Sequence, residues 1–404
     1  MNWGTIRFGD LYSTESRNGL TKPSKIRGSG YKMINMGELF ANDRIYDIPM
    51  ELAPLKDTEK INAKIEIGDL LFARQSLVLE GAGKCSIVME VSPLTVFESH
   101  LIRVRLDRKR ALPMFYYYYF KSPLSPMASI VSQCAQAGIR GSDLQELNVI
   151  FPPLYIQNKI AQILSYYDDL IENNQKQIKL LEEAAQRLYK EWFIDLRFPG
   201  HETTPIVDGV PEGWTRCCLE NVISFNPKVS LSKERLKQSV PMSALSTTSM
   251  ILDFNEFTTT YSNAGSKFQN GDTLLARITP CLENGKTAFV SGIESSEGAV
   301  GSTEYIVMRE KEINPYMVYL LARTEDFRQA AINSMTGSDG RQRAQVDKLK
   351  TLPYLKPTIQ VIELFARCVE PMFIQIQTKN RQNMELKQAR DRLLPKLMSG
   401  EIEV

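Results

Sequence analysis

The heptad GDLLFAR at residues 68–74 returns as GDTLLAR at residues 271–277, about two hundred residues later along the chain. The likeness extends on both sides of the heptad. Downstream, HLIRVR (100–105) matches EYIVMR (304–309), and farther on LLEEAAQRL (180–188) matches ELKQARDRL (385–393). Solenoid repeats have periods of only about 20–50 residues, so a period this long indicates a duplicated domain.

Length and composition agree with a duplicated globular protein. A chain of 404 residues is expected to form two or three domains. Apolar residues make up 43% and charged residues 24%, and no run of about 18 apolar residues is available to cross a bilayer. The sequence does not open on a secretory signal. We therefore expect a cytoplasmic protein without a membrane partner. A formal net charge of +2 argues neither for nor against nucleic acid.

Each copy divides into a globular part and a long helix. Short β-branched and aromatic runs broken by Gly, Asn, Pro and Ser predict strands in the globular parts, at KCSIVMEV (84–91), HLIRVRL (100–106), KTAFVSGI (286–293) and EYIVMR (304–309). Helical spacing in MFYYYYFKS (114–122) and PYMVYLLARTEDFRQAAI (315–332) makes the fold class mixed α/β (α+β). The predicted boundaries are a first globular domain at 1–152, a central helical spacer at 153–197, a linker with the second globular domain at 198–354, and a C-terminal helical spacer and tail at 355–404.

Between Ile156 and Phe193 there is no Gly or Pro, and apolar residues recur at spacings of three and four. Some forty residues of helix would span about 60 Å. Because a helix so long with one narrow apolar seam needs a partner, we predict that the helices of the two copies pair with each other as an antiparallel coiled coil. The alternative is that each helix lies on its own globular domain. The predicted pairing residues are Ile160, Ile163, Tyr167, Leu170, Leu181 and Leu188 in the first helix, and Ile362, Val369, Met372, Ile376, Leu386 and Leu393 in the second. Polar residues interrupt the seam at Asn174, Gln177, Lys379 and Asn383.

Two like domains on a stiff spacer would present two similar surfaces at a set distance. If the helices pair in opposite directions, the surfaces are related by an approximate twofold axis, which is the symmetry that a DNA duplex offers to proteins that bind it. Such a molecule would measure two sites at once.

Catalytic motifs are hard to find in the sequence. EGAGKCS (80–86) departs from the phosphate-loop pattern at both ends, and FPPL (151–154) lacks the flanking residues of an amino-methyltransferase tetrapeptide. Six cysteines without C-x-x-C spacing and two histidines make a zinc site improbable. We interpret the cysteines as reduced and mostly structural, namely Cys85, Cys134, Cys217, Cys218, Cys281 and Cys368. We expect no active site, no metal and no cofactor on this chain.

Basic and amide side chains gather in two turns of each copy. An Arg ends the strand of the repeated heptad, and a Gly-Lys closes the loop that follows it. A second pair of turns is QAGIRGSD (136–143) and TGSDGRQRAQ (336–345). Arg, Gln, Thr and Lys are the residue types that reach guanine edges, adenine edges and phosphates. The candidate DNA-binding residues are Arg74, Gln75, Lys84 and Arg140 in the first copy, and Arg277, Thr279, Lys286, Arg341 and Arg343 in the second. The alternative for any one of them is a solvated surface side chain or a local salt bridge.

Three stretches make the chain resemble the specificity (S) subunit of type I restriction–modification systems. They are FPPLYIQNKIAQILSYYDDLIENNQKQIKLLEEAAQRLYKEWF (151–193), GDTLLARITPCLENGK (271–286) and RDRLLPKLMSGEIEV (390–404). The resemblance covers nearly the whole chain. One departure is visible, because the first loop, QSLVLEGAGK (75–84), lacks the CLENGK of the second, which puts the transfer of its contacts in doubt.

The resemblance implies two target-recognition domains, each reading one half of a split, asymmetric sequence in double-stranded DNA. It also implies that the paired helices act as a spacer and as a docking platform for two methyltransferase (M) subunits. Those subunits would bring S-adenosylmethionine, and restriction (R) subunits would complete an ATP- and Mg-dependent nuclease, so this chain would bind no cofactor itself. Two other functions stay open at this point: a single-chain DNA methyltransferase or nuclease with an unrecognised active site, and a scaffold that does not bind DNA.

Overall fold

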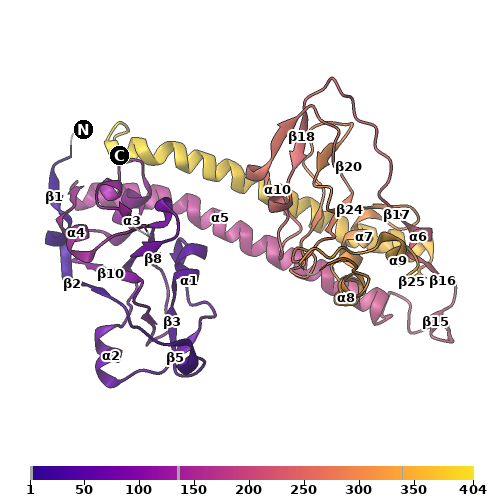
Figure 1. Ribbon diagram of the computed structural model, residues 1–404, viewed down its shortest axis with the longest axis horizontal. Coiled ribbons are helices and arrows are strands. Elements are labelled where there is room, and N and C mark those ends of the chain that lie inside the picture. Colours follow the sequence, from indigo (N-terminus) through magenta and orange to yellow (C-terminus); the bar gives the residue numbers. More distant parts are fainter. Residues whose placement is uncertain (1–2, 134–136, 339) are drawn as a thin grey trace. The chain divides into compact units, whose positions relative to one another are not determined.

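The computed structural model describes residues 3–133, 137–338 and 340–404, and the chain forms two compact units. Unit 1 consists of Met1–Leu170 together with Glu385–Val404, and unit 2 consists of Ile171–Met384. Each unit contains a mixed globular part and stretches of two long helices (Figure 1). The predicted mixed α/β class and the two long helices are confirmed. Each long helix contributes residues to both units.

The elements of unit 1 alternate short strands with short helices. The strands are β1 (Thr5–Arg7), β2 (Tyr12–Asn18), β3 (Tyr31–Ile34), β4 (Arg44–Ile45), β5 (Leu52–Ala53), β6 (Leu70–Ala73), β7 (Gln75–Ser76), β8 (Cys85–Val88), β9 (Val96–Phe97), β10 (Leu101–Leu106), β11 (Ser132–Gln133), β12 (Ala137–Gly138) and β13 (Asn148–Ile150). The helices are α1 (Met36–Ala41), α2 (Asp57–Asn62), α3 (Pro113–Lys121) and α4 (Gly141–Glu146).

Unit 2 follows the same plan. Its strands are β14 (Ile206–Val207), β15 (Val210–Pro211), β16 (Thr215–Cys218), β17 (Ile223–Phe225), β18 (Lys237–Val240), β19 (Thr258–Thr260), β20 (Ser266–Phe268), β21 (Thr273–Ala276), β22 (Thr287–Phe289), β23 (Ala299–Gly301), β24 (Tyr305–Glu310) and β25 (Pro353–Lys356). Its short helices are α6 (Leu219–Val222), α7 (Pro315–Ala322), α8 (Glu325–Asn333) and α9 (Val346–Lys350). The long helices are α5 (Leu154–Tyr189), continued by a π-helical turn at Lys190–Ile194, and α10 (Ile359–Ser399).

Sheet topology confirms the duplication that the repeated heptad predicts. The main sheet of unit 1 has the order β2-β10-β6-β8-β4, and that of unit 2 has the order β17-β24-β21-β22. The heptad strands β6 and β21 therefore occupy the same central place, each antiparallel to both neighbours. A second small sheet also recurs, because β3 pairs with β9 and β18 pairs with β23, both in parallel.

A buried ion pair explains why the Gly-Asp of the heptad occurs twice. In unit 1, Arg105 donates from Nε and Nη2 to the two carboxylate oxygens of Asp69, at 2.7 and 2.8 Å. In unit 2, Arg309 binds Asp272 in the same bidentate way at 2.6 and 2.7 Å. Both aspartates are 1% exposed. A buried carboxylate is tolerated only when its lone pairs are satisfied, so the Asp and the Arg must be retained together. We call each of these pairs the Asp–Arg clamp.

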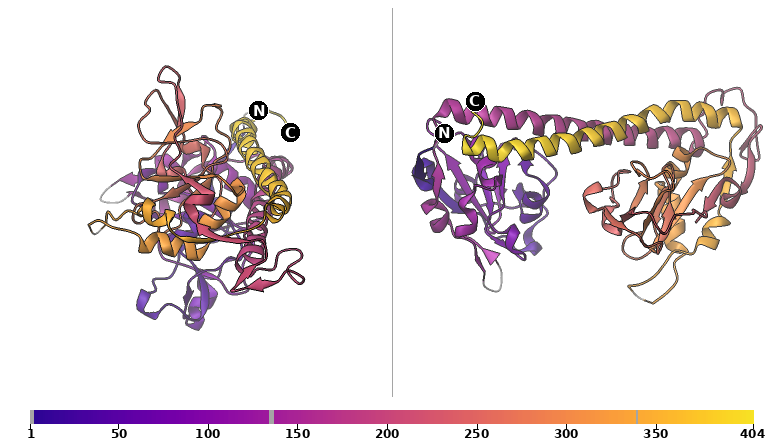
Figure 2. Two further views of the ribbon diagram at one scale, coloured as in Figure 1. Left: turned by 90° about the vertical axis from the view of Figure 1, so that its right-hand side faces the viewer. Right: turned by 90° about the horizontal axis from the view of Figure 1, so that it is seen from above.

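The long helices lie side by side and run in opposite directions within each unit (Figure 2). In unit 2, Asn174 contacts Asn383 near one end, while Tyr189 and Trp192 pack on Phe365 near the other, with ring centroids 6.0 and 5.5 Å apart. Residue numbers thus rise along α5 while they fall along α10. Burying large aromatic side chains such as these stabilises the unit by about 1.5–3 kcal/mol each.

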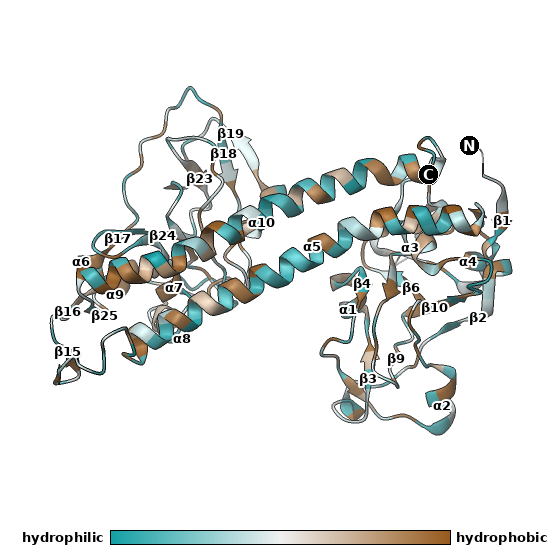
Figure 3. Cartoon of the chain, turned by 180° about the vertical axis from the view of Figure 1, so that it is seen from behind, coloured by the Kyte–Doolittle hydropathy of each residue, from teal (hydrophilic) through white to brown (hydrophobic). Residues whose placement is uncertain are grey.

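The buried stripe of α5 differs in part from the predicted seam. Leu170 is 51% exposed, so its predicted pairing is wrong. Ile163, Tyr167, Leu181, Leu188, Met372, Leu386 and Leu393 are only partly buried, whereas Ile160, Ile362, Val369 and Ile376 are fully buried. The buried stripe also contains polar residues, namely Asn174, which the sequence indicated as a polar interruption, and Asp168 and Glu182, which it did not indicate. Figure 3 shows hydrophilic and hydrophobic residues alternating along both helices.

Each buried polar residue of the stripe has a partner. In unit 1, Asp168 accepts from Arg390 at 2.5 Å and from the Tyr118 hydroxyl at 2.7 Å. In unit 2, the Asn174 amide donates to the Asn383 side-chain oxygen at 3.0 Å. These pairs join α5 to α10 inside each unit and fix which residues face each other, as a buried Asn does in a coiled coil.

Glu182 ties α5 to the globular part of unit 2. Its carboxylate accepts from the Ser249 hydroxyl at 2.7 Å and from the Met250 backbone N–H at 2.9 Å. Desolvation raises the pKa of this buried carboxyl. Helix α5 is therefore a structural part of unit 2 and not a free rod. The predicted pairing of the long helices is confirmed, and each helix also packs in part on its own globular domain, since Ile160 of α5 lies in the core of unit 1 and Phe373 of α10 in the core of unit 2.

Candidate nucleic-acid interface

The two candidate loops of unit 1 lie together at the end of the heptad strand. Gln75 and Ser76 in β7 pair with β12, which pairs in turn with β11, and so a small three-stranded sheet joins the two loops. The backbone N–H of Ile139 donates to the carbonyl of Arg74 at 2.9 Å. Loops far apart in the sequence thus form one surface, which we call loop surface 1.

Unit 2 builds an equivalent surface, loop surface 2, from the equivalent loops. The N–H of Ala344 donates to the carbonyl of Arg277 at 2.8 Å, as that of Ile139 does to Arg74. Isolated bridges join Arg343 to Ile278 and to Thr336. Thr279 donates its backbone N–H to the Gln342 carbonyl at 3.1 Å. The backbone construction recurs although the loop sequences differ, so the two surfaces share a support and differ in the side chains they present.

The two candidate lysines also take part in the support. Lys84 donates from Nζ to the carbonyl of Phe40 at 2.8 Å, and Lys286 donates to the carbonyl of Met242 at 2.9 Å. Lys84 is also 3.3 Å from a carboxylate oxygen of Asp43. These contacts anchor the loop to a neighbouring helical turn. Each lysine therefore contributes to the shape of its surface, a role that the sequence did not indicate when both lysines were selected as candidate DNA-binding residues.

The candidate arginines divide into two groups. Arg140 and Arg341 are exposed. Arg74 donates to the carbonyl of Ser99 at 3.5 Å, and no carboxylate of a described residue pairs with it. Arg277 and Arg343 instead converge on one carboxylate, that of Glu304. Gln136 of the candidate loop QAGIRGSD and Asp339 of the candidate loop TGSDGRQRAQ lie outside the described residues.

Loop surface 1 carries three exposed apolar residues that the motif search did not select. Leu77, Val78 and Leu79 are 90%, 59% and 45% exposed. Apolar side chains of this kind read the methyl group of thymine or enter between base steps. The signal was present in the sequence, because QSLVLEG puts three apolar residues in a loop that also contains turn-forming residues.

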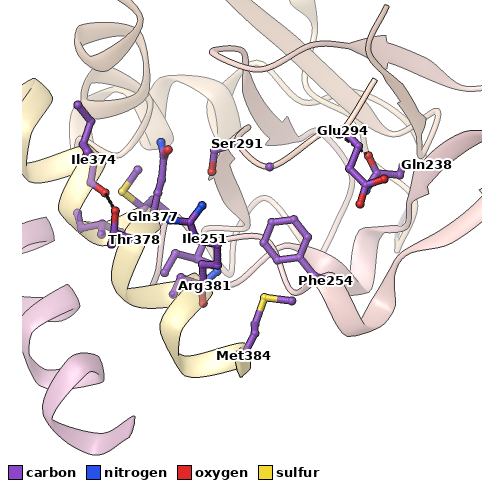
Figure 4. Close-up of a pocket in the computed structure, with 14 residues that line it drawn as sticks. Gln238, Ile251, Phe254, Ser291, Glu294, Ile374, Gln377, Thr378, Arg381 and Met384 are labelled. Carbon is purple, nitrogen blue, oxygen red and sulfur yellow. Dashed lines mark hydrogen bonds between the residues drawn. The ribbon is translucent and has the colours of Figure 1, made fainter. Parts of the chain in front are cut away.

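A cavity in unit 2 offers no catalytic set. It measures about 400 Å³ and lies between α10 and the globular part (Figure 4). Arg381 and Glu294 are its charged lining residues, and no His or Cys lines it. Over the described ranges there is no group of three or more His, Cys, Asp or Glu placed to hold a metal ion, and no helix is long and apolar enough to cross a membrane.

The cysteines do not form a reactive cluster in the part of the chain that the structure describes. Cys85, Cys217, Cys218, Cys281 and Cys368 are free thiols, and burial raises the pKa of Cys85 well above its usual range. A thiol of raised pKa is a poor nucleophile. The sixth cysteine, Cys134, lies outside the described residues.

Comparison with known proteins finds similar sequences. Residues 1–183 match the family model described as the type I restriction modification DNA specificity domain. The type I restriction enzyme MjaIX specificity subunit of Methanocaldococcus jannaschii is 26% identical over 100% of this chain and 94% of its own length. The EcoAI specificity subunit of Escherichia coli is 31% identical, over 37% of this chain and 26% of its own length.

A solved structure shares the fold. The crystal structure of the type I restriction–modification S subunit from M. genitalium matches with a TM-score of 0.56 and 15% sequence identity, and the match covers 98% of this chain and 96% of that one. The duplicated plan with two long helices is therefore common to both proteins.

Proposed function

We propose that the chain is the DNA-reading subunit of a type I restriction complex, with each loop surface reading one half of a split target. The match of residues 1–183 to the specificity-domain model and the similarity of the whole chain to a specificity subunit support this proposal. The observation that carries the proposal is the paired construction of the two surfaces. The same Asp–Arg clamp and the same backbone contacts support loops whose side chains differ. A conserved support with different readers is what recognition of an asymmetric target requires.

The side chains of the two surfaces suit base and phosphate recognition. Arg74 and Gln75 on surface 1 can bind guanine and adenine edges, and Arg277 with Thr279 can do so on surface 2. The exposed Arg140 and Arg341 are proposed to contact phosphates, which position a protein on DNA without reading sequence. A net charge of +2 is compatible with this function if partner subunits supply further phosphate contacts.

The helices are proposed to set the gap between half-sites and to dock two M subunits. Tyr155, Tyr166 and Leu170 are exposed on α5 at 63%, 57% and 51%, and their spacing puts them on one face of the helix in unit 1. Exposed aromatic and aliphatic side chains on one face are typical of a protein–protein interface. In this proposal the M subunits carry S-adenosylmethionine, R subunits carry ATP and Mg, and this chain has no catalytic activity.

Reciprocal alanine substitutions test the assignment of one half-site to each unit. The chain is purified with its M subunits, and its target is obtained by mapping methylated adenines in the host genome. Arg74→Ala and Arg277→Ala are then compared on targets mutated in one half-site at a time. Each substitution should weaken binding by about 1–3 kcal/mol and relax preference in one half-site only, with the two variants affecting different halves.

Two results would contradict the proposal. Equal loss on every sequence would make both arginines phosphate contacts, and a wild-type complex without sequence preference would remove the reading function altogether. Methylation or cleavage of DNA by the isolated chain would favour the single-chain enzyme instead.

Spacer function is tested by a matched deletion of one heptad from each helix, Glu172–Ile178 and Lys379–Glu385. Seven residues remove about 10 Å of helix while nearly preserving its buried face. The preferred gap should shorten by up to about three base pairs, at about 3.4 Å per pair, and both half-site sequences should stay the same. A changed half-site would show that the helices take part in reading and do not only set the spacing.

A further inference from the structure

The two loop surfaces carry different types of side chain at one structurally equivalent position. In unit 1 the N–H of Arg74 donates to the carbonyl of His100 at 2.8 Å, and in unit 2 the N–H of Arg277 donates to the carbonyl of Glu304 at 3.0 Å. His100 and Glu304 therefore hold the same place in the fold. Only unit 2 has a carboxylate there.

Glu304 is hydrogen-bonded to the arginine of one loop of surface 2 and lies at ion-pair distance from the arginine of the other. The Arg343 Nε donates to its two carboxylate oxygens at 2.9 and 3.0 Å, and the Arg343 Nη2 donates to Oε1 at 2.7 Å. The Arg277 Nε lies 3.3 Å from Oε2. Hydrogen bonding with Arg343 lowers the pKa of the Glu304 carboxyl, so it is charged at neutral pH. One carboxylate thus joins the end of β21 to the loop 336–345.

The cluster formed by Arg277, Arg343 and Glu304 is exposed enough to contact a ligand, and its side chains are held in place before the ligand binds. The side chains of Arg277, Arg343 and Glu304 are 32%, 37% and 22% exposed. Arg343 also donates from Nη1 to the carbonyl of Arg341 at 3.2 Å, which further restricts its plane. A guanidinium held in one plane loses less entropy when it binds a planar base edge.

We infer that Glu304 is a positioning residue that makes unit 2 selective for base edges over phosphates, an inference that rests on the proposed function. The carboxylate orients two guanidinium groups and cancels part of their charge. A phosphate approaching this site meets a like charge, so the arginines gain little from the DNA backbone. A guanine edge accepts hydrogen bonds from a guanidinium, and a neighbouring cytosine amino group can donate to the carboxylate. Unit 1, with Arg74 and no carboxylate at this position, lacks this filter.

Glu304→Gln is the direct test because it keeps the shape and removes the charge. The complex with M subunits is titrated with its target, with targets altered in each half-site and with random-sequence DNA, at several salt concentrations. Discrimination in the half-site read by unit 2 should fall by roughly 10- to 100-fold, while the other half-site is unaffected. Affinity for random DNA should rise, and the slope of log K against log salt should steepen by up to about 0.9 for one added phosphate contact.

Two further variants separate positioning from simple charge or folding effects. Glu312→Gln is the matched control, since Glu312 is ion-paired with Lys356 and lies beyond the opposite end of β24, roughly 20 Å along the strand. It removes the same charge from the same unit and should change neither quantity. Arg343→Lys keeps the charge but loses the bidentate fork, so it should reduce discrimination without steepening the salt slope.

The possible outcomes are distinct. If the wild-type complex reads no sequence, the proposed function fails. If it does read its target but Glu304→Gln behaves as Glu312→Gln does, the positioning role is overturned. If Glu304→Gln melts early, Arg343→Lys decides, because unchanged discrimination in that variant also overturns the inference.

Discussion

Removing the arginine of one Asp–Arg clamp should destabilise the unit that contains it far more than the loss of an ordinary surface charge. The change considered is Arg309→Met, which keeps most of the volume of the side chain and removes both hydrogen bonds to Asp272. Asp272 is 1% exposed, and among the described residues it would keep only the Gln269 N–H, at 2.8 Å, as a hydrogen-bond donor to its side chain.

The magnitude follows from leaving a buried charge without its partner. Breaking a buried ion pair on one side costs about 3–5 kcal/mol, whereas an exposed pair is worth about 0–1 kcal/mol. Native domains are stable by only about 5–15 kcal/mol, so the variant should lose a large part of the stability of unit 2. Replacing Asp272 as well, in Arg309→Met with Asp272→Leu, should recover part of the loss because no charge is then left buried.

Tryptophan fluorescence can report unit 2 alone. The chain has three tryptophans, and Trp192 and Trp214 are buried in the core of unit 2 while Trp3 belongs to unit 1. In a Trp3→Phe background, urea unfolding followed by fluorescence should show the midpoint falling by about 1–5 M for a loss of about 3–5 kcal/mol and a slope of about 1–3 kcal/mol/M. A midpoint within about 0.3 M of the parent would refute the reasoning, as would a double variant that is less stable than Arg309→Met.

Two further predictions concern the polar residues of the helix stripe. Asn174→Leu alone should destabilise unit 2 by about 1–3 kcal/mol because it leaves the Asn383 side chain buried without its partner. Changing both Asn174 and Asn383 to Leu should recover that loss. Urea midpoints that fall equally for the single and the double variant would contradict this prediction. The stability of the Glu182→Gln variant relative to that of the parent protein should increase as pH rises. The pKa of Glu182 is raised in the folded state, so its contribution to stability is fully present below the unfolded-state pKa and is lost as pH rises through the folded-state pKa. If the melting temperatures of the variant and the parent change in parallel between pH 4 and 7, this prediction is wrong.

The duplication, the strands and the long helices were predictable because they depend on periodicity and on repeated letters. The heptad strands β6 and β21, and the two helices within PYMVYLLARTEDFRQAAI, are found where the sequence predicts them. The single predicted helical stretch there is two helices, since the Thr324 hydroxyl accepts from the Phe327 N–H and begins α8.

The pairing residues of the helices were only partly predictable. A search for large apolar residues selects Leu170, which is half exposed, and passes over Asp168 and Glu182, which are buried. The burial of these acids depends on Arg390, Ser249 and the Met250 N–H, which lie elsewhere in the chain. Helical spacing gives the face of one helix, but it does not show which polar residues find partners on another element.

The candidate loops were predicted as a set, and their internal organisation was not. Sequence reasoning placed Arg277 and Arg343 in separate turns and did not include Glu304, because a single acid before a strand resembles many others. The alignment of the two copies contained the signal, since it sets Glu304 opposite His100 in an otherwise similar strand. Whether any of these residues touches a base stays a prediction.

Unit 1 is formed by two segments that are far apart in the sequence, and they are therefore translated at different times. Its globular part is synthesised before unit 2, yet Arg390, Leu394 and Leu397, which pack against or bind its stretch of α5, belong to the segment Glu385–Val404, which is synthesised after unit 2. Roughly two hundred residues of unit 2 are translated in between. At about 5–20 residues per second, the globular part of unit 1 waits about 10–40 s for the segment Glu385–Val404 to be synthesised. A truncation just before Glu385 would therefore damage unit 1, although most of unit 1 is translated before unit 2.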